Sequence, residues 1–249
     1  MAGLRLKGMD TRRMKAVLLL VAAIAFASAP LWTSGFGGFD PTRYPNPQFD
    51  PPVQPAGYAF SIWGPIYLWL IVHGVYGLLA RAEAEDWDRT RWPLFISLAI
   101  GTSWISVAQV NPPLATLLIW VMLAGALVAL LRTPARDRWL LAAPVGLYAG
   151  WLTAASFVSI GLLGAGYGVA FGETGWAWAA VVAAFATVLA VQSRVPQSPE
   201  YGLAAAWAFV AIAVGNWGTG WGLVVAAILA ATLVALYALA GFRTARRTA

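Results

Sequence analysis

Eight long apolar stretches, separated by short polar segments, constrain this chain more than any other feature of its sequence. Each stretch approaches the roughly 20 residues that an α-helix needs to cross the hydrocarbon core of a bilayer. Charged residues make up only 10% of the chain, whereas they make up about 25% of a soluble domain. The sequence therefore predicts an all-α integral membrane protein. The eight expected spans are residues 15–33, 57–81, 93–110, 113–132, 139–163, 175–193, 200–216 and 219–241.

The first apolar stretch admits two interpretations. Arg12, Arg13 and Lys15 precede its apolar core, as basic residues do in a secretory signal peptide. The apolar run continues to Trp32, however, and no small-x-small cleavage site precedes a soluble domain. A retained helix is the favoured interpretation.

The positions of the basic residues predict the orientation. With a cytoplasmic N-terminus, fifteen of the sixteen Lys and Arg residues fall on the cytoplasmic side, and only Arg43 falls outside. This split follows the positive-inside rule. The net charge of +6 is then explained by topology and by attraction to anionic membrane lipids, so no nucleic-acid partner is expected. Both termini are expected to be cytoplasmic, and the expected location is the bacterial inner (cytoplasmic) membrane.

Two connecting segments have distinctive compositions. The outside loop 34–56 is rich in proline and is expected to be stiff and extended. The inside segment 81–91, RAEAEDWDRTR, mixes charges of both signs and is expected to be a solvated helix end.

The chain lacks the residues that most membrane enzymes and pumps require. Apart from Glu200, the first residue of the seventh expected span, no Asp or Glu lies inside an expected span, although ion-coupled transporters usually carry ionisable groups there. The chain has no Cys, and its only lysines, Lys7 and Lys15, are near the N-terminus, so neither a thiolate site nor a retinal Schiff base within the bundle can form. We expect no enzymatic activity and no required cofactor.

The single histidine, His73, lies in the second expected span. One histidine cannot make a conventional zinc site. Its imidazole could ligate the metal of a haem or a magnesium tetrapyrrole, or it could hydrogen-bond a neighbouring helix. The second role is the favoured one.

Aromatic residues repeat at helical spacing in two of the expected spans. Side chains three or four residues apart share one face of a helix. The two faces comprise Phe60, Trp63 and Tyr67 in the second span, and Tyr148, Trp151, Ala155 and Ser159 in the fifth. Such faces either pack against each other or line a cavity for a flat apolar ligand.

A glycine and a proline follow the first tryptophan of the second span. Proline inside a helix removes a hydrogen bond, and glycine costs about 1 kcal/mol relative to alanine. Gly64 and Pro65 are therefore expected to loosen the helix backbone, so that the aromatic face turns toward a cavity under the proline-rich loop.

Several short motifs resemble the tryptophan-rich sensory protein, or translocator protein, family (TspO/MBR). That family has a P-x-W-x-P-P loop before its second helix, and residues 47–52 here read PQFDPP, with Phe49 in place of Trp. The family's next helix opens with Trp and, four residues on, Tyr, which here are Trp63 and Tyr67. The match to these motifs continues into the third and fifth helices.

The later motifs match the family in part. The third helix of the family carries N-x-x-W, of which Trp104 remains, with Gly101 in place of Asn. The fifth carries Y-x-x-W, which here is Tyr148 and Trp151, but the Asn eight residues after the Trp is replaced by Ser159. These losses reduce the polar contacts that the resemblance would otherwise imply.

The resemblance implies a TspO-like five-helix bundle that is extended here to about eight transmembrane helices. The expected organisation is a basic cytoplasmic N-terminus (1–14), the five-helix unit (15–164), three additional helices (165–242) and a basic cytoplasmic tail (243–249).

The resemblance also implies a ligand site. Similar proteins bind porphyrins or sterol-like molecules, so the expected partners are membrane lipids and a planar lipophilic small molecule, and a tetrapyrrole or a lipid could be bound. The implied site residues are Phe60, Trp63, Tyr67, Trp104, Tyr148, Trp151 and Ser159.

Two other functions remain open at this point. The chain could be a structural or assembly subunit of a larger membrane complex, or a homodimer, because its last three spans are rich in the small residues that allow close helix contacts. An enzyme acting on a porphyrin or isoprenoid is the least supported function.

The predicted topology can be tested with engineered cysteines, because the native chain has none. A cysteine in place of Thr42 should react with an impermeant thiol reagent from outside the cell. A cysteine in place of Thr248 should react only after the membrane is opened. Labelling of both positions from the same side would contradict the eight-span topology.

Overall fold

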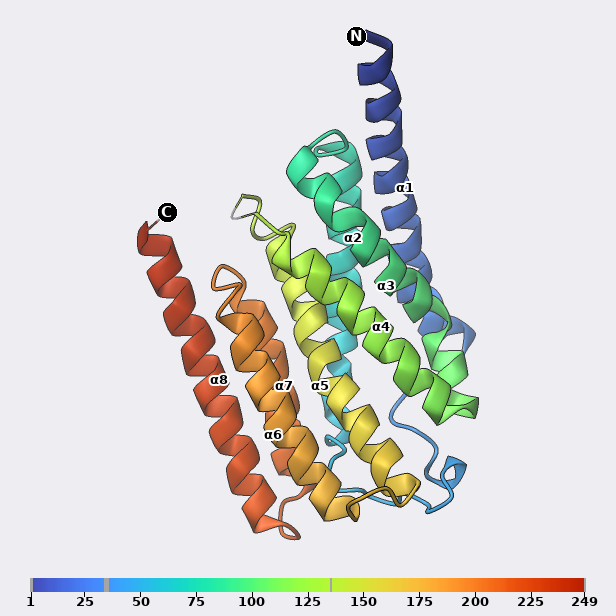
Figure 1. Cartoon of the computed structure of the whole chain (residues 1–249), viewed down its shortest axis with the longest axis vertical. Helices are drawn as coiled ribbons and strands as arrows, with labels where there is room; N and C mark the ends of the chain where they lie inside the picture. Colours follow the sequence, from blue (N-terminus) through green and yellow to red (C-terminus); the bar gives the residue numbers. More distant parts are fainter. Residues whose placement is uncertain (1, 34–35, 135, 249) are drawn as a thin grey trace.

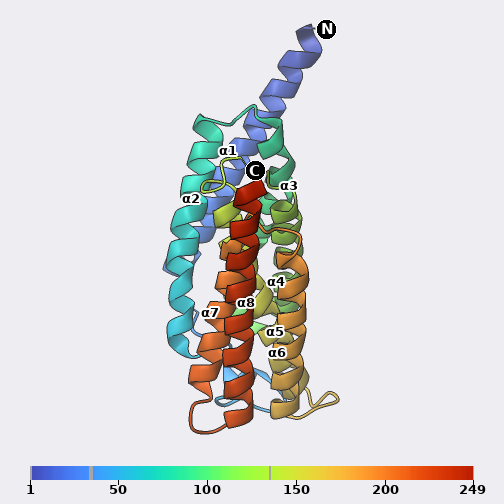
Figure 2. The ribbon, with the colours of Figure 1, turned by 90° about the vertical axis from the view of Figure 1, so that its left-hand side faces the viewer.

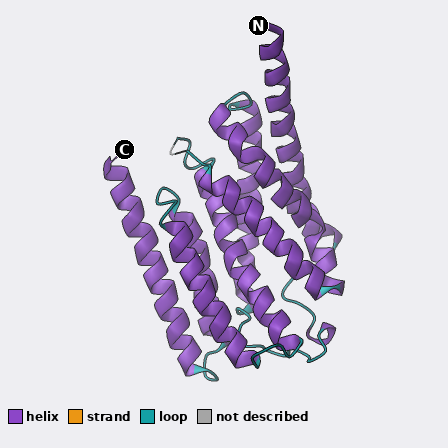
Figure 3. Cartoon of the chain, viewed as in Figure 1, coloured by secondary structure: helices purple, strands orange, loops and turns teal. Residues whose placement is uncertain are grey.

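In a computed structural model of the chain, which describes residues 2–33, 36–134 and 136–248, eight long α-helices form one bundle in which successive helices run antiparallel (Figure 1). Apart from the segment between α1 and α2, the connections are short (Figure 3). The α-helices are α1 (Ala2–Trp32), α2 (Trp63–Leu79), α3 (Glu85–Val110), α4 (Pro112–Leu131), α5 (Ala142–Gly166), α6 (Glu173–Gln192), α7 (Pro199–Gly215) and α8 (Trp221–Thr248). Two short 3-10 helices, η1 (Pro41–Arg43) and η2 (Gly57–Ile62), lie between α1 and α2.

Five helices form a closed ring, and three more pack on one side of it. In the ring, α1 contacts α2 and α3, α3 contacts α4, α4 contacts α5, and α5 returns to α2. Helices α6 and α7 pack on α5, and α8 covers both of them (Figures 1 and 2). Helix α5 therefore belongs to both groups. In the apolar 18-residue stretch of this span, 72% of the residues are buried, against 28–44% in the other spans.

Seven of the described helices are long and apolar enough to cross a membrane, which makes this an integral membrane protein. The remaining helix, α7, is apolar but only 17 residues long, which is at the lower limit for a spanning helix. Most of its side chains are buried against α5 and α8.

The start of α2 differs from the sequence-based expectation. Residues Gly57–Ile62 form a 3-10 turn, and the α-helix begins only at Trp63. Gly64 and Pro65 therefore lie in the first turn, where proline removes no intrahelical hydrogen bond. The expected loosening of the helix interior was wrong, and the proline instead marks the point where the α-helix begins.

The structure also differs from the expectation for the segment between α2 and α3. Helix α3 starts at Glu85, eight residues before the expected span, and the side chains of Trp87 and Arg91 are only 1% exposed. The Arg91 guanidinium donates to the backbone oxygens of Arg12, Ala82 and Arg81 at 3.0, 2.8 and 2.7 Å. Arg91 is therefore a buried cation that satisfies backbone carbonyl groups near the end of α2. The expectation that residues 81–91 form a solvated helix end was wrong.

Both chain termini lie at the same end of the bundle (Figure 1). The α2–α3, α4–α5 and α6–α7 connections lie at this end too, and they carry the basic residues that the sequence predicts to be cytoplasmic. The proline-rich segment lies at the opposite end (Figure 1).

Small residues bring α5 and α7 into backbone contact. A Cβ added at Gly150 would lie 2.1 Å from the carbonyl oxygen of Tyr201, and one added at Gly146 would lie 2.0 Å from Ser198 Oγ. These approaches are possible only without a side chain, as in other membrane helix pairs that pack through small residues.

Substituting Gly150 with Ala should therefore destabilise the bundle. The obstacle is the backbone of α7, which cannot rotate away, so we expect a loss of about 2 kcal/mol, typical of overpacking. Reversible unfolding in mixed micelles, followed by circular dichroism, would measure it. The control is Gly222→Ala on α8, where the added Cβ would meet Trp178 at an ordinary 3.4 Å. Equal stability of the two variants would contradict the proposed close contact.

Candidate functional site

Aromatic side chains from α1, α2 and α5 meet inside the five-helix ring. The ring centroid of Phe26 lies 5.7 Å from that of Trp63, 5.1 Å from that of Tyr67 and 5.7 Å from that of Tyr148. Trp63 and Tyr67 are stacked, with centroids 5.3 Å apart and an angle of 16° between the rings. The cluster fixes the aromatic face of α2 toward the interior.

A glycine on α3 makes room for Phe26. A Cβ at Gly101 would lie 2.6 Å from Cε2 of Phe26 and 3.1 Å from Cε of Met122. Both distances are shorter than a comfortable van der Waals contact. At the position where the family resemblance implies Asn, this chain therefore places an aromatic ring from another helix.

The hydroxyl of Tyr148 is held behind this cluster. It lies 2.9 Å from Ser97 Oγ, which in turn donates to the carbonyl oxygen of Met122 at 2.7 Å. The chain of hydrogen bonds joins α5, α3 and α4 inside the apolar core. Because both hydroxyls are satisfied there, Tyr148 is a packing residue that supports the ring of Trp63.

A cavity of about 350 Å³ adjoins the aromatic cluster. Its walls come from α1 to α5 and from the start of the proline-rich segment, and none of its lining residues is charged. The volume is within the range of small-molecule sites. Residues that contribute large surfaces are Phe26, Phe36, Trp63, Tyr67, Trp104 and Met122.

We call this the larger cavity, because a much narrower one lies next to it. It reaches the outer surface of the bundle beside α2. Gly64 lines it and is exposed, and a Cβ added there would meet no atom within 4 Å. Leu68 and Val72, one and two turns further on the same face, are 66% and 41% exposed. In a spanning helix such a face lies toward lipid, so the opening beside Gly64 is lateral.

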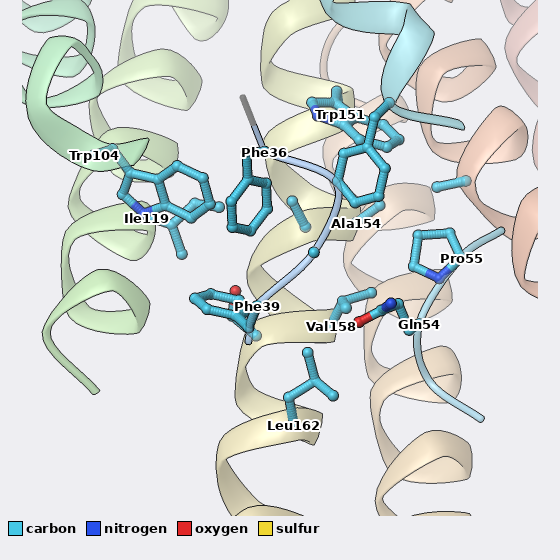
Figure 4. Close-up of a pocket in the computed structure, with 15 residues that line it drawn as sticks. Phe36, Phe39, Gln54, Pro55, Trp104, Ile119, Trp151, Ala154, Val158 and Leu162 are labelled. Atoms are coloured by element: carbon cyan, nitrogen blue, oxygen red, sulfur yellow. The ribbon is translucent and has the colours of Figure 1, made fainter. Parts of the chain in front are cut away.

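A second, narrow cavity of about 40 Å³ lies next to the larger one, under the proline-rich segment (Figure 4). It has room for only a few water molecules. Phe36 and Phe39 close it on one side, and Trp151 lies in its wall. The indole Nε1 of Trp151 is buried without a hydrogen-bond partner among the described residues, so it remains a donor for water or for a ligand atom.

The proline-rich segment is fastened to the ends of α5 and α7. The amide of Asn46 donates to the last carbonyl of α5 at 2.8 Å, and the amide of Ala56 donates to Ala211 O at 3.0 Å. Asn216 Nδ2 donates to Pro52 O at 2.8 Å. The segment is therefore a fixed cover over the outer end of the bundle.

The residues implied by the family resemblance occupy three places. Phe60, Trp63, Tyr67 and Trp104 line the larger cavity, Trp151 and Ser159 line the narrow one, and Tyr148 packs behind Trp63. The space expected between the faces of α2 and α5 is filled by the rings of Trp63 and Trp151, whose centroids are 6.1 Å apart at 85°. The open volume lies on the other side of Trp63, toward α1, α3 and α4.

Sequence reasoning did not identify several of the lining residues. Phe26, Phe36, Ile119 and Met122 belong to α1, α4 and the loop, where no aromatic periodicity marks them. The one available signal was Gly101, a missing side chain opposite an apolar helix. Phe49, which occupies the motif position of the family's Trp, is 65% exposed and lines neither of the two cavities.

His73 lies outside both cavities, nearer the end of the bundle that carries the termini. Its Nδ1 is 2.7 Å from the carbonyl oxygen of Leu140, and its ring stacks on Trp87 with centroids 5.0 Å apart. The contact joins α2 to the segment just before α5, whereas the favoured interpretation predicted a hydrogen bond to a neighbouring helix itself. Its Nε2 has no partner among the described residues.

A polar cluster closes the bundle at this end. Asp137 accepts from Arg81 at 2.6 and 3.1 Å and from Trp87 Nε1 at 3.0 Å. The hydrogen bonds from Arg81 hold the pKa of the Asp137 carboxyl below its usual value, so the pair is charged at neutral pH. Because a depressed pKa favours folding above the unfolded-state value, this contribution is lost as acid is added.

A comparison with protein families gives a match over most of the chain. A family described as TSPO-like protein matches residues 15–240, from the basic start of the first span nearly to the end of α8. The chain belongs to the TSPO-like protein family. Comparisons with curated proteins and with solved structures gave no match.

The extent of the match bears on the three C-terminal helices. It runs through α6 and α7 and ends within α8, so the matched region includes these helices and is not confined to the five-helix ring.

A variant of His73 can test its role. His73→Ala should leave the Soret band of any bound porphyrin unchanged, because the imidazole lines neither cavity. The same variant should be less stable by about 2 kcal/mol, since it loses a buried hydrogen bond and a stacked ring. Absorption spectra and thermal unfolding in detergent would measure both. A shifted or missing Soret band would instead make His73 an axial ligand.

Proposed function

We propose that this protein binds a planar lipophilic ligand, such as a tetrapyrrole, in the larger cavity between α1 and α5. The observation that carries the proposal is an uncharged cavity of about 350 Å³ whose walls include Trp63, Tyr67 and Trp104. Aromatic faces favour flat apolar molecules, and each favourable ring pair adds about 0.5–1.5 kcal/mol beyond area burial.

The lateral opening supports a ligand that arrives through the lipid. A lipophilic molecule is concentrated in the bilayer, and the opening beside Gly64 lies on the face that carries the exposed Leu68 and Val72. Residues at intervals of four share one helix face. Exchange with the bilayer therefore needs no passage through water.

The proposal also assigns the protein an orientation in the membrane and gives its two groups of helices different roles. Both termini are placed in the cytoplasm of a bacterial cell, with the proline-rich segment outside its inner membrane, as the distribution of basic residues favours. The unit 15–164 would hold the ligand. The helices within 165–242 would brace α5 and the proline-rich segment, a role supported by the hydrogen bonds of Ala56 and Asn216.

Quenching of tryptophan fluorescence by a porphyrin, titrated into the detergent-solubilised protein, would test the site. Trp63→Ala should weaken binding by about 2 kcal/mol, roughly thirtyfold, because the ligand loses a ring face and a void is left. Trp151→Ala should weaken it less, since Trp151 lines only the narrow cavity.

The matched control is Trp221→Ala at the start of α8, where the indole is 56% exposed. It should bind like the wild type. Equal affinities of the wild type and Trp63→Ala would rule out this cavity as the site. An absence of saturable binding would favour the alternative, a structural or assembly subunit of a larger membrane complex.

A further inference from the structure

A third space lies outside the two apolar cavities, at the outer face. It has a volume of about 480 Å³, and its lining includes Asp40, Arg43 and Gln109. We call it the outer vestibule. It differs from the larger cavity in carrying charged side chains, so it can receive a polar group that the larger cavity cannot.

Phe36 connects the outer vestibule with the interior. It lines the vestibule, the narrow cavity and the larger cavity. Its ring makes edge-on contacts with Phe39, Phe60 and Trp104 at centroid distances of 5.3, 5.8 and 4.8 Å. One side chain thus separates a polar space from an apolar one, and a ligand that passes beside this ring contacts both.

Arg43 is the only Lys or Arg that the topology places outside. The positive-inside rule gives no reason for a cation there. Among the described residues its guanidinium pairs only with Asp40, through Nε at 3.4 Å, and both terminal nitrogens have no partner. A guanidinium with two free terminal nitrogens matches a carboxylate in a bidentate arrangement.

The surroundings of Arg43 favour a single negative charge. Oδ1 of Asp40 already accepts from the amide and the hydroxyl of Thr42, at 2.9 and 2.7 Å. The Asp40 carboxylate thus accepts hydrogen bonds from within its own turn, but its negative charge remains close to the Arg43 guanidinium. A dianionic phosphate would be repelled by it more strongly than a monoanionic carboxylate.

We propose that the outer vestibule binds the carboxylate of an amphiphilic ligand through Arg43, while the planar body of that ligand occupies the larger cavity. The inference rests on the proposed function and narrows its ligand class. Because the ligand must pass beside the Phe36 ring, the carboxylate is carried on a flexible alkyl arm and not directly on the ring system.

A ligand pair that differs only in charge tests this assignment. The probes are 1-pyrenebutyric acid and its methyl ester, and energy transfer from tryptophan to pyrene in the detergent-solubilised full chain reports binding at pH 7. The ratio of the ester Kd to the acid Kd should fall about tenfold in Arg43→Gln compared with the wild type, as for a lost charged hydrogen bond. Because only the change in this ratio is compared, differences in micelle partitioning cancel.

Two further variants locate the effect. Asp40→Asn keeps the guanidinium and removes its neighbour, so the preference for the acid should be retained or increased. Trp63→Ala should weaken the acid and the ester by the same factor, because it changes only the apolar part of the site.

Several outcomes would overturn the inference. A Kd ratio that is the same in the wild type and in Arg43→Gln would show that Arg43 serves only to pair with Asp40. If Asp40→Asn no longer preferred the acid over the ester, the preference would depend on Asp40 and not on Arg43 alone. If neither probe binds saturably to the wild type, the proposed function fails together with the inference, whereas tight binding of both probes without discrimination leaves the proposed function in place.

Discussion

Two glycines allow the backbones of α5 and α7 to touch, and the rest of the structure depends on this contact. Without side chains at Gly146 and Gly150, α5 can lie against α7 on one side while it closes the five-helix ring on the other. In a bilayer, lipid tails compete equally for apolar surface, so close packing of small residues replaces the hydrophobic effect as the force between helices. The ring, the cavity inside it and the three additional helices are thereby held as one bundle.

The elements of the fold could be predicted from hydropathy, because a bilayer imposes a length and a composition on each span. The expected span 175–193 and the observed α6 (Glu173–Gln192) differ by two residues or fewer. The prediction failed where tertiary contacts override a local pattern. Arg91 and Trp87 are buried because they satisfy groups on α1, α2 and the α4–α5 loop, which are distant in sequence.

The candidate site was predictable only in part, for a related reason. Spacing within a helix identifies which side chains share a face, so the aromatic residues of α2 were found. It does not reveal which faces meet or where a gap remains. That gap depends on Phe26 and Gly101, an aromatic ring on α1 and an absent side chain on α3, and each is unremarkable until the two helices are placed together.

The polar cluster at the terminal end has a consequence for what the interior can exchange with. The guanidinium of Arg91 and the Arg81–Asp137 pair fill the space between the helix ends there, and the core beneath them, from Leu70 to Leu94 and Leu98, is at most 1% exposed. The interior of the five-helix ring is therefore closed at the end of the bundle that carries the termini. Under the proposed function, a molecule bound beside Trp63 would leave toward the bilayer or toward the outer face, so in this conformation the protein would act as a reservoir and not as a conduit across the membrane.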